Sequence, residues 1–138
     1  MNTTAMKALQ SYTRIGVETG VAAADPHKLI LLLFEGAMLA ITDARTHMTA
    51  RRIAPKGRAL TKAIAIIDGG LKASLEMKAG GELAERLAGL YDYMCNRIVQ
   101  ANAQNDPAIL DEVSKLLSEL ATAWASIGRH AARAPRRD

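Results

Sequence analysis

The chain has 138 residues, a length typical of a single domain that can bury a hydrophobic core. Hydrophobic residues make up 49% of the chain and aromatic residues only 4%, which favours packed helices, because strands are enriched in valine, tyrosine and phenylalanine. The formal net charge is +4, but the basic residues gather at the C-terminal end and around an expected loop (Arg45, Arg51, Arg52, Lys56 and Arg58). Neither group is interleaved with aromatic residues, which argues against a nucleic-acid-binding protein.

The cysteine content and the lengths of the apolar runs limit the cellular compartments in which the protein is expected. The single cysteine, Cys95, excludes an intramolecular disulfide and fits a reducing environment. Residues 1–24 lack the basic start and apolar run of a secretory signal. The longest apolar run, 29–34, is far shorter than the roughly 20 residues that span a bilayer. We therefore expect a cytoplasmic protein without membrane insertion.

Residues 1–24 form a weakly patterned N-terminal segment. Their apolar positions, which include Tyr12 and Val17, fit a short amphipathic helix that Gly16 and Gly20 would interrupt. A frayed terminus fits the pattern equally well.

A long helix is predicted to begin at Asp25 and Pro26, because aspartate is a favoured N-cap and proline suits the first helical position. It is expected to reach Thr49. Leu32 and Leu39 fall on the side opposite the core face, where leaving each leucine in water forgoes about 1.5–3 kcal/mol. Either the N-terminal segment or another chain is expected to cover them. The core face is predicted to comprise Ile30, Phe34, Ala37, Ile41, Ala44 and Met48.

A loop marked by Pro55 is predicted over 51–56, followed by a second helix over 57–77. The pair Gly69-Gly70 lies in its interior, where each glycine costs up to about 1 kcal/mol relative to alanine. Gly70 shares a second apolar stripe with Ile66, Ala73 and Met77. A glycine there leaves a notch that either a helix of another chain or close packing inside the bundle would fill.

A glycine-rich turn over 78–81 leads into a third helix over 82–104. Tyr91 and Tyr93 lie on opposite flanks of its apolar face, and Arg97 is one turn from Tyr93. A second aspartate–proline pair then starts a fourth helix that ends near His130. Its apolar face is broad, because Ile109 and Leu116 lie beside the inward stripe of Leu110, Val113, Leu117, Leu120, Ala121 and Trp124.

These elements predict an all-α fold, an antiparallel four-helix bundle over 25–130. Residues 1–24 are expected to form a short helical or extended cap, and residues 131–138 a disordered basic tail.

Catalytic patterns are missing from the sequence. The three histidines lie near helix ends without carboxylates at ligand spacing, and the inward positions are aliphatic, unlike those of a di-iron bundle. Cys95 has no CxxC partner and is interpreted as a buried, inert thiol. We therefore expect neither an enzyme nor a metal or cofactor site.

Apolar residues beside the main core stripe occur on several of the helices. Exposed apolar grooves of this kind usually bind a partner, and grooves between helices suit amphipathic helical segments. A homo-oligomeric structural bundle, such as a homodimer, would instead bury these additional apolar residues against a second copy of the chain.

The third helix carries Leu90-Tyr91-Asp92-Tyr93-Met94, then Arg97 and Ala101-Asn102, a combination that resembles the FliS family of flagellar secretion chaperones. The resemblance covers about positions 5–127 and departs from the family pattern at Gly69-Gly70 and in the arginine-rich tail. Further matching segments include Asp25-Pro26-His27-Lys28-Leu29-Ile30, Gly80-Gly81-Glu82-Leu83-Ala84 and Ala123-Trp124.

The resemblance implies a cytoplasmic chaperone that binds the disordered C-terminal segment of flagellin, prevents premature polymerisation and serves the flagellar type III export apparatus. On this reading the N-terminal cap set, which lies over a client groove, comprises Tyr12, Val17, Leu32 and Leu39. Two of the client-binding candidates have an alternative role: Met94 as a core residue, and Asn102 as a structural link to the next loop. The full set of client-binding candidates is Ile66, Met77, Tyr91, Tyr93, Met94, Arg97, Asn102, Ile109 and Leu116.

Overall fold

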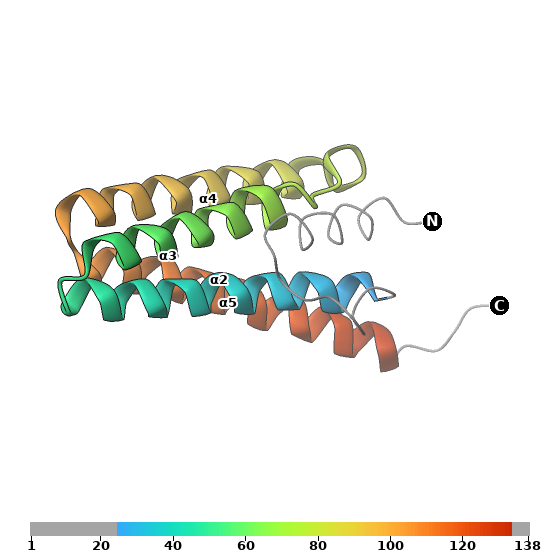
Figure 1. Cartoon of the computed structure of the whole chain (residues 1–138). Coiled ribbons are helices and arrows are strands. Elements are labelled where there is room, and N and C mark those ends of the chain that lie inside the picture. The colour runs from blue at the N-terminus through green and yellow to red at the C-terminus, as the bar shows by residue number, and fades with distance from the viewer. Residues whose placement is uncertain (1–24, 134–138) are drawn as a thin grey trace.

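The computed structural model describes residues 25–133, with side chains through residue 128. Its regular structure is entirely helical, which confirms the predicted all-α fold. No helix in this range is both long enough and apolar enough to cross a membrane. The elements are α2 (Pro26–Thr49), α3 (Ile53–Ile66), a π-helix η2 (Ile67–Lys72), α4 (Met77–Gln104) and α5 (Pro107–Arg133) (Figure 1).

The four α-helices form an up-down-up-down bundle (Figure 1). Each helix packs against the next one in the chain, and α2 also packs against α5, which closes the ring. The backbones of the diagonal pairs, α2 with α4 and α3 with α5, do not approach each other closely. Every helix therefore has two neighbours, and its apolar face must be wide enough to meet both.

The start and core face of α2 follow the sequence pattern. The Asp25 carboxylate accepts a hydrogen bond from the backbone N–H of Lys28 at 3.2 Å, and Pro26 occupies the first turn. This confirms the predicted N-cap. The residues expected to face the core are all buried: Ile30, Phe34, Ala37, Ile41, Ala44 and Met48.

The notch at Gly70 is filled from within the bundle. A Cβ atom on this glycine would lie 3.0 Å from Cδ2 of Leu33, a residue of α2 that is itself 1% exposed. Of the two interpretations of the glycine pair, close internal packing is the one that the structure confirms.

Three predicted boundaries differ from those of the structure. α3 begins at Ile53, so the loop is shorter than 51–56, because a proline in the first helical turn sacrifices no hydrogen bond. The turn predicted over 78–81 is confirmed in part, because Gly81 (φ 53°, ψ −129°) interrupts the helical geometry there, but α4 already begins at Met77 and the connection from η2 is 73–76. α5 continues to Arg133, beyond the predicted end at His130.

Candidate binding cleft

An apolar cleft of about 250 Å³ opens at the end of the bundle where α2 begins. Three α-helices and η2 contribute to its walls, and nearly all of the contributing side chains are aliphatic or aromatic. Such a lining suits an apolar face of a peptide or helix rather than a polar small molecule. The lining residues are Ile30, Phe34, Leu71, Ser74, Leu75, Leu83, Leu87, Tyr91, Leu120, Ala123, Trp124 and Ile127.

One wall of the cleft has irregular backbone. The π-helix η2 follows α3 without a break and ends at Lys72, and the connection 73–76 leads into the kinked start of α4. The buried Ser74 hydroxyl donates to the carbonyl oxygen of Gly70 at 2.7 Å, which satisfies the hydroxyl next to the cleft. This irregular stretch brings Leu71 and Leu75 into the same cleft as Leu83 of α4.

The α4 wall consists of Leu83, Leu87 and Tyr91, which share one helical face at intervals of four residues. Leu83 is 66% exposed, whereas Tyr91 is 4% exposed. Burial raises the pKa of Tyr91 to about 12, so its hydroxyl stays protonated at neutral pH. Within residues 25–133 no hydrogen bond of this hydroxyl is seen, and Tyr91 belongs to the lining of the cleft.

The α5 wall is fixed by a reciprocal contact between Trp124 and His27 of α2. The two rings stack with centroids 4.9 Å apart and planes 9° from parallel. Trp124 Nε1 donates to the carbonyl oxygen of His27 at 2.9 Å, and His27 Nε2 lies 2.6 Å from the carbonyl oxygen of Trp124. Because a carbonyl oxygen can only accept, Nε2 of His27 must carry a hydrogen.

A polar network ties α4 to α5. Glu112 accepts from Tyr93 Oη at 2.6 Å and from Arg97 Nε at 2.8 Å, and Arg97 also donates to Gln100 at 2.7 Å. The hydrogen bonds from Tyr93 and Arg97 lower the pKa of Glu112, and the bond to Glu112 raises the pKa of Tyr93. The structure therefore brings Tyr93 and Arg97 together, but as groups that hold two helices side by side.

Three of the client-binding candidates are buried in the core of the bundle, and their contact with a client stays a prediction. Ile66 and Met94 are 0% exposed, and Ile109 is 5% exposed. The physical reason is that each helix packs against two neighbours, so positions beside the main stripe turn toward the second neighbour. Met94 thus takes the alternative, core role.

The other candidates are scattered. Met77 is 48% exposed at the start of α4, and Leu116 is half-buried against the core. Asn102 is exposed, and its backbone carbonyl accepts from Lys56 Nζ at 3.3 Å, a structural contact at the end of α4. Tyr91 alone lines the apolar cleft.

The four cap residues divide in the same way. Leu32 is half-buried against the core, whereas Leu39 is 71% exposed. Tyr12 and Val17 lie outside the described residues, so their role as a cap stays a prediction.

Most of the cleft was missed because its residues continue the core stripes. Leu71, Leu75, Leu87 and Trp124 follow the same periodicity as buried residues deeper in the bundle. The available signal was the pair of double glycines, 69–70 and 80–81, which bracket the irregular wall. Glycine pairs mark places where a helix is able to kink and lose its regular geometry.

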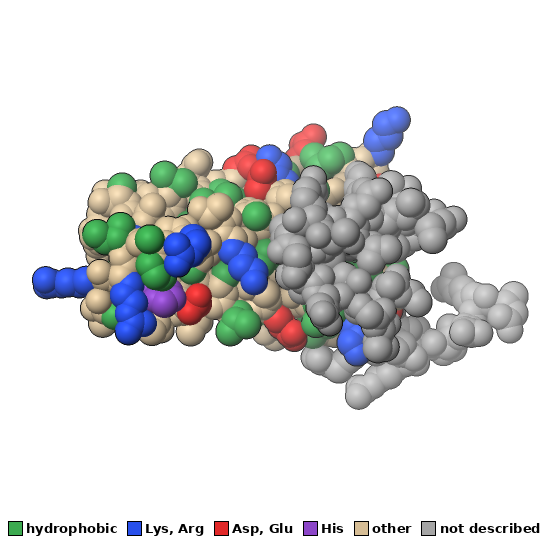
Figure 2. Space-filling model, viewed as in Figure 1, with side chains coloured by type: hydrophobic (Ala, Val, Ile, Leu, Met, Phe, Trp, Pro, Cys, Tyr) green, Lys and Arg blue, Asp and Glu red, His purple; other side chains and the backbone are tan. Residues whose placement is uncertain are grey.

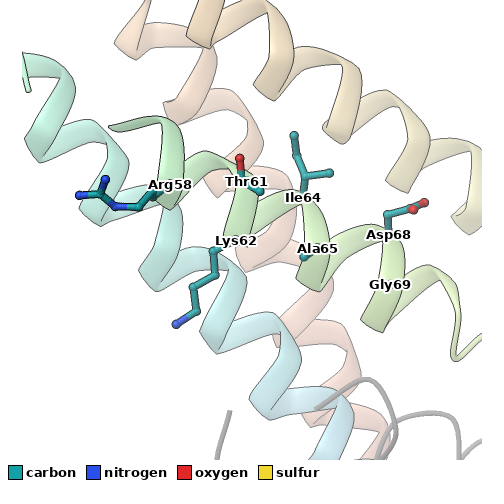
Figure 3. Close-up of a pocket in the computed structure, with 7 residues that line it drawn as sticks. All are labelled: Arg58, Thr61, Lys62, Ile64, Ala65, Asp68 and Gly69. Carbon is teal, nitrogen blue, oxygen red and sulfur yellow. The ribbon is translucent and has the colours of Figure 1, made fainter. Parts of the chain in front are cut away.

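Outside the cleft, two further hollows involve residues of α2 and α3. The face seen in Figure 2 carries Lys and Arg side chains among hydrophobic, acidic and histidine side chains. Another hollow, on the outer face of α3, is lined only by residues of α3 and η2, with Lys62 and Ile64 extending to opposite sides of the helix (Figure 3). A hollow on a single helix cannot enclose a small molecule.

Residues that could carry metal or thiol chemistry do not gather within 25–133. No group of three or more histidine, cysteine or acidic residues in this range could hold a metal ion. Burial raises the pKa of Cys95 to about 11, so its thiol stays protonated at neutral pH.

The comparisons with known proteins agree over most of the chain. The family profile described as "Flagellar protein FliS" matches residues 8–131. The chain is 47% identical over 119 residues to the flagellar secretion chaperone FliS of Salmonella typhimurium, covering 86% of this chain and 88% of the relative. It is 46% identical over 123 residues to the flagellar secretion chaperone FliSB of Pseudomonas aeruginosa, covering 89% and 97%. It is also 40% identical to the Escherichia coli FliS over 120 residues, covering 87% and 88%.

Proposed function

The chain belongs to the FliS family of flagellar secretion chaperones, and from this premise we propose that it binds the disordered C-terminal segment of flagellin in the apolar cleft. Binding would keep flagellin from polymerising in the cytoplasm and hold it ready for the flagellar type III export apparatus.

The observation that carries the proposal is the exposed apolar rim of the cleft. Leu83 of α4 is 66% exposed and Ile127 of α5 is 58% exposed, and both line the same opening as the aromatic ring of Trp124. Large apolar side chains beside an apolar cleft are typical of a surface that a partner covers.

A disordered client fits the physics of this surface. Ordering a flexible segment costs free energy, and burial of apolar side chains along an inter-helix groove offsets that cost. The Tyr91 hydroxyl provides a donor within the apolar lining for a backbone carbonyl of the client.

The test is a charge inserted at the rim. We expect Leu83→Asp combined with Ile127→Asp to weaken flagellin binding at least about tenfold in isothermal titration calorimetry, because a client apolar face would meet two carboxylates. Both side chains are largely exposed, so the helical circular dichroism signal should not change.

The matched control is Val99→Asp. Val99 is 59% exposed on the same helix as Leu83 but does not line the cleft, so its variant should bind flagellin normally. Flagellin lacking its C-terminal segment should not bind the wild-type protein. Full affinity for truncated flagellin, or for the rim variant, would contradict the proposal, and concentration-dependent dimerisation lost in the rim variant would favour a homo-oligomeric bundle.

A further inference from the structure

Basic side chains without partners gather on the side of the bundle away from the cleft. Arg51, Arg52, Arg58 and Lys62 are all exposed and form no ion pair within the described part of the chain. Two other cations are paired, since Arg45 lies 2.7 Å from Asp111 and Lys72 lies 2.7 Å from Asp92. Within the described residues these four cations outnumber the acidic residues that line hollows beside them, Asp43 and Asp68.

The same side is concave. A groove between α2 and α3 has a floor of small residues, Gly36, Ala40 and Ala59, and is flanked by Leu39, Asp43 and Lys62. A second hollow follows toward the α2–α3 connection, where Arg51, Arg52 and Ile53 contribute to its lining. We call these two hollows, together with Arg58, the basic α2–α3 face.

Two apolar side chains stand out on this face. Leu39 is 71% exposed and Ile53 is 78% exposed, the largest exposed fractions among the big hydrophobic residues that the structure describes. One contributes to each hollow. Exposed apolar anchors within a basic, concave surface point to a ligand with the opposite charge and an apolar stripe.

We propose that the basic α2–α3 face docks an acidic amphipathic helix of a second protein, at a site separate from the client cleft. Glutamates or aspartates of the helix would pair with Arg51, Arg52, Arg58 and Lys62, and its apolar side chains would cover Leu39 and Ile53. Because the residues at the floor of the groove are small, the backbone of a docked helix is able to approach α2 and α3 closely.

An acidic protein helix suits this surface better than a nucleic acid or an anionic membrane does. No phenylalanine, tyrosine or tryptophan lines either hollow, and His47 is the one aromatic ring there, so the row of stacking side chains that single-stranded nucleic acids use is missing. A bilayer surface is flat on this scale, whereas the apolar anchors here belong to grooves. The nucleic-acid and membrane alternatives become outcomes of the test.

The two surfaces use separate sets of residues. No side chain that lines the apolar cleft lines either hollow of the basic α2–α3 face. On α2, the cleft uses Ile30 and Phe34, whereas the basic face begins at Gly36 and continues toward the other end of the helix. The proposal therefore requires that a bound client leave this face free for a further partner.

The probe is a labelled synthetic amphipathic peptide with leucine along one helical face and glutamate elsewhere, followed by fluorescence anisotropy. We expect Arg52→Glu combined with Lys62→Glu to weaken its binding about tenfold, because two attractive pairs become repulsive. The matched control, Lys78→Glu combined with Lys115→Glu, makes the same change in net charge at exposed positions elsewhere and should preserve binding. Leu39→Ser should also weaken binding while leaving its salt dependence unchanged.

Three results would overturn the proposal: equal binding of the matching leucine–lysine peptide, equal losses in the control variant, or stronger binding of anionic vesicles or single-stranded DNA than of the acidic peptide. Flagellin separates this site from the proposed function. The Arg52→Glu, Lys62→Glu variant should bind flagellin with wild-type affinity, and a parallel loss would place this face in the client site. If the wild-type protein binds the acidic peptide but does not bind flagellin, the proposal for the basic α2–α3 face is supported and the proposed client site in the cleft is refuted.

Discussion

Gly128 lies where α5 passes closest to the first turn of α2. A Cβ atom at this position would collide with the imidazole of His27, whose ring is held by stacking on Trp124 and by the hydrogen bond of Nε2. The ring cannot move aside without losing both contacts. We therefore expect Gly128→Ala to lower the free energy of unfolding by about 1–3 kcal/mol in urea denaturation.

The control for this prediction is Gly89→Ala. Gly89 lies in the interior of α4, where an added Cβ would meet nothing within 4 Å. Alanine should stabilise the fold there by up to about 1 kcal/mol through helix propensity. A stabilising effect at Gly128 would show that the His27–Trp124 contact does not constrain the two helices.

Glu112 makes the stability of the α4–α5 contact depend on pH. Its pKa in the folded protein lies below the reference value of 4.5, because the carboxylate accepts hydrogen bonds from Tyr93 and Arg97. A lowered folded pKa means that the contribution is present above the unfolded pKa and is lost as pH falls through the folded pKa. Glu112→Gln should therefore be less stable than wild type at pH 7, and the gap should close below a pH of about 4.5.

Urea denaturation over a series of pH values measures this gap. Glu119→Gln removes an exposed carboxylate from the same helix without breaking a hydrogen bond seen in the structure, and its gap to wild type should stay small throughout. A pH-independent loss of stability in Glu112→Gln would assign the role of Glu112 to packing rather than charge.

At the scale of the elements, the end of α4 is secured by a side chain from another helix. Lys56 of α3 is 5% exposed, and its Nζ donates to the backbone carbonyl of Asn102 and to the side chain of Asn105. A cation at this place also interacts favourably with the negative end of the α4 dipole. Lys56 was predicted to lie in the loop 51–56, and its place in a helix follows from the early start of α3.

Replacing Lys56 with methionine keeps the length of the side chain but removes its donors. The carbonyl of Asn102 loses its side-chain donor, so Lys56→Met should cost about 1–3 kcal/mol of unfolding free energy. Lys62→Met, at an exposed position of the same helix, is the control and should have little effect. Equal stability of the two variants, measured by thermal and urea unfolding, would show that α4 does not need this cap.

The sequence was sufficient to predict the boundaries of those elements whose local signals agree. The start of α2 combines an N-cap, a first-turn proline and a regular apolar stripe, and all three predict the same boundary. The stretch from η2 to Gly81 lacks such agreement, because its glycines permit several backbone geometries. Periodicity also assigns one inward direction per residue, so it cannot distinguish Leu87 in an open cleft from Ile98 in a closed core.

At the scale of the whole molecule, the bundle presents an apolar cleft at one end and a basic face along α2 and α3. Because the cleft includes Trp124, the only tryptophan in the chain, intrinsic fluorescence reports on its occupancy. A flagellin C-terminal segment without tryptophan should shift the emission of Trp124 as it displaces water from the cleft, and the acidic peptide should leave the emission unchanged. Saturation with the flagellin segment should leave the anisotropy titration of the acidic peptide unaltered, because the two sites share no residue and the proposal assigns them no coupling. Competition between the two ligands would show instead that they share one continuous surface, which would make the basic α2–α3 face part of the client site.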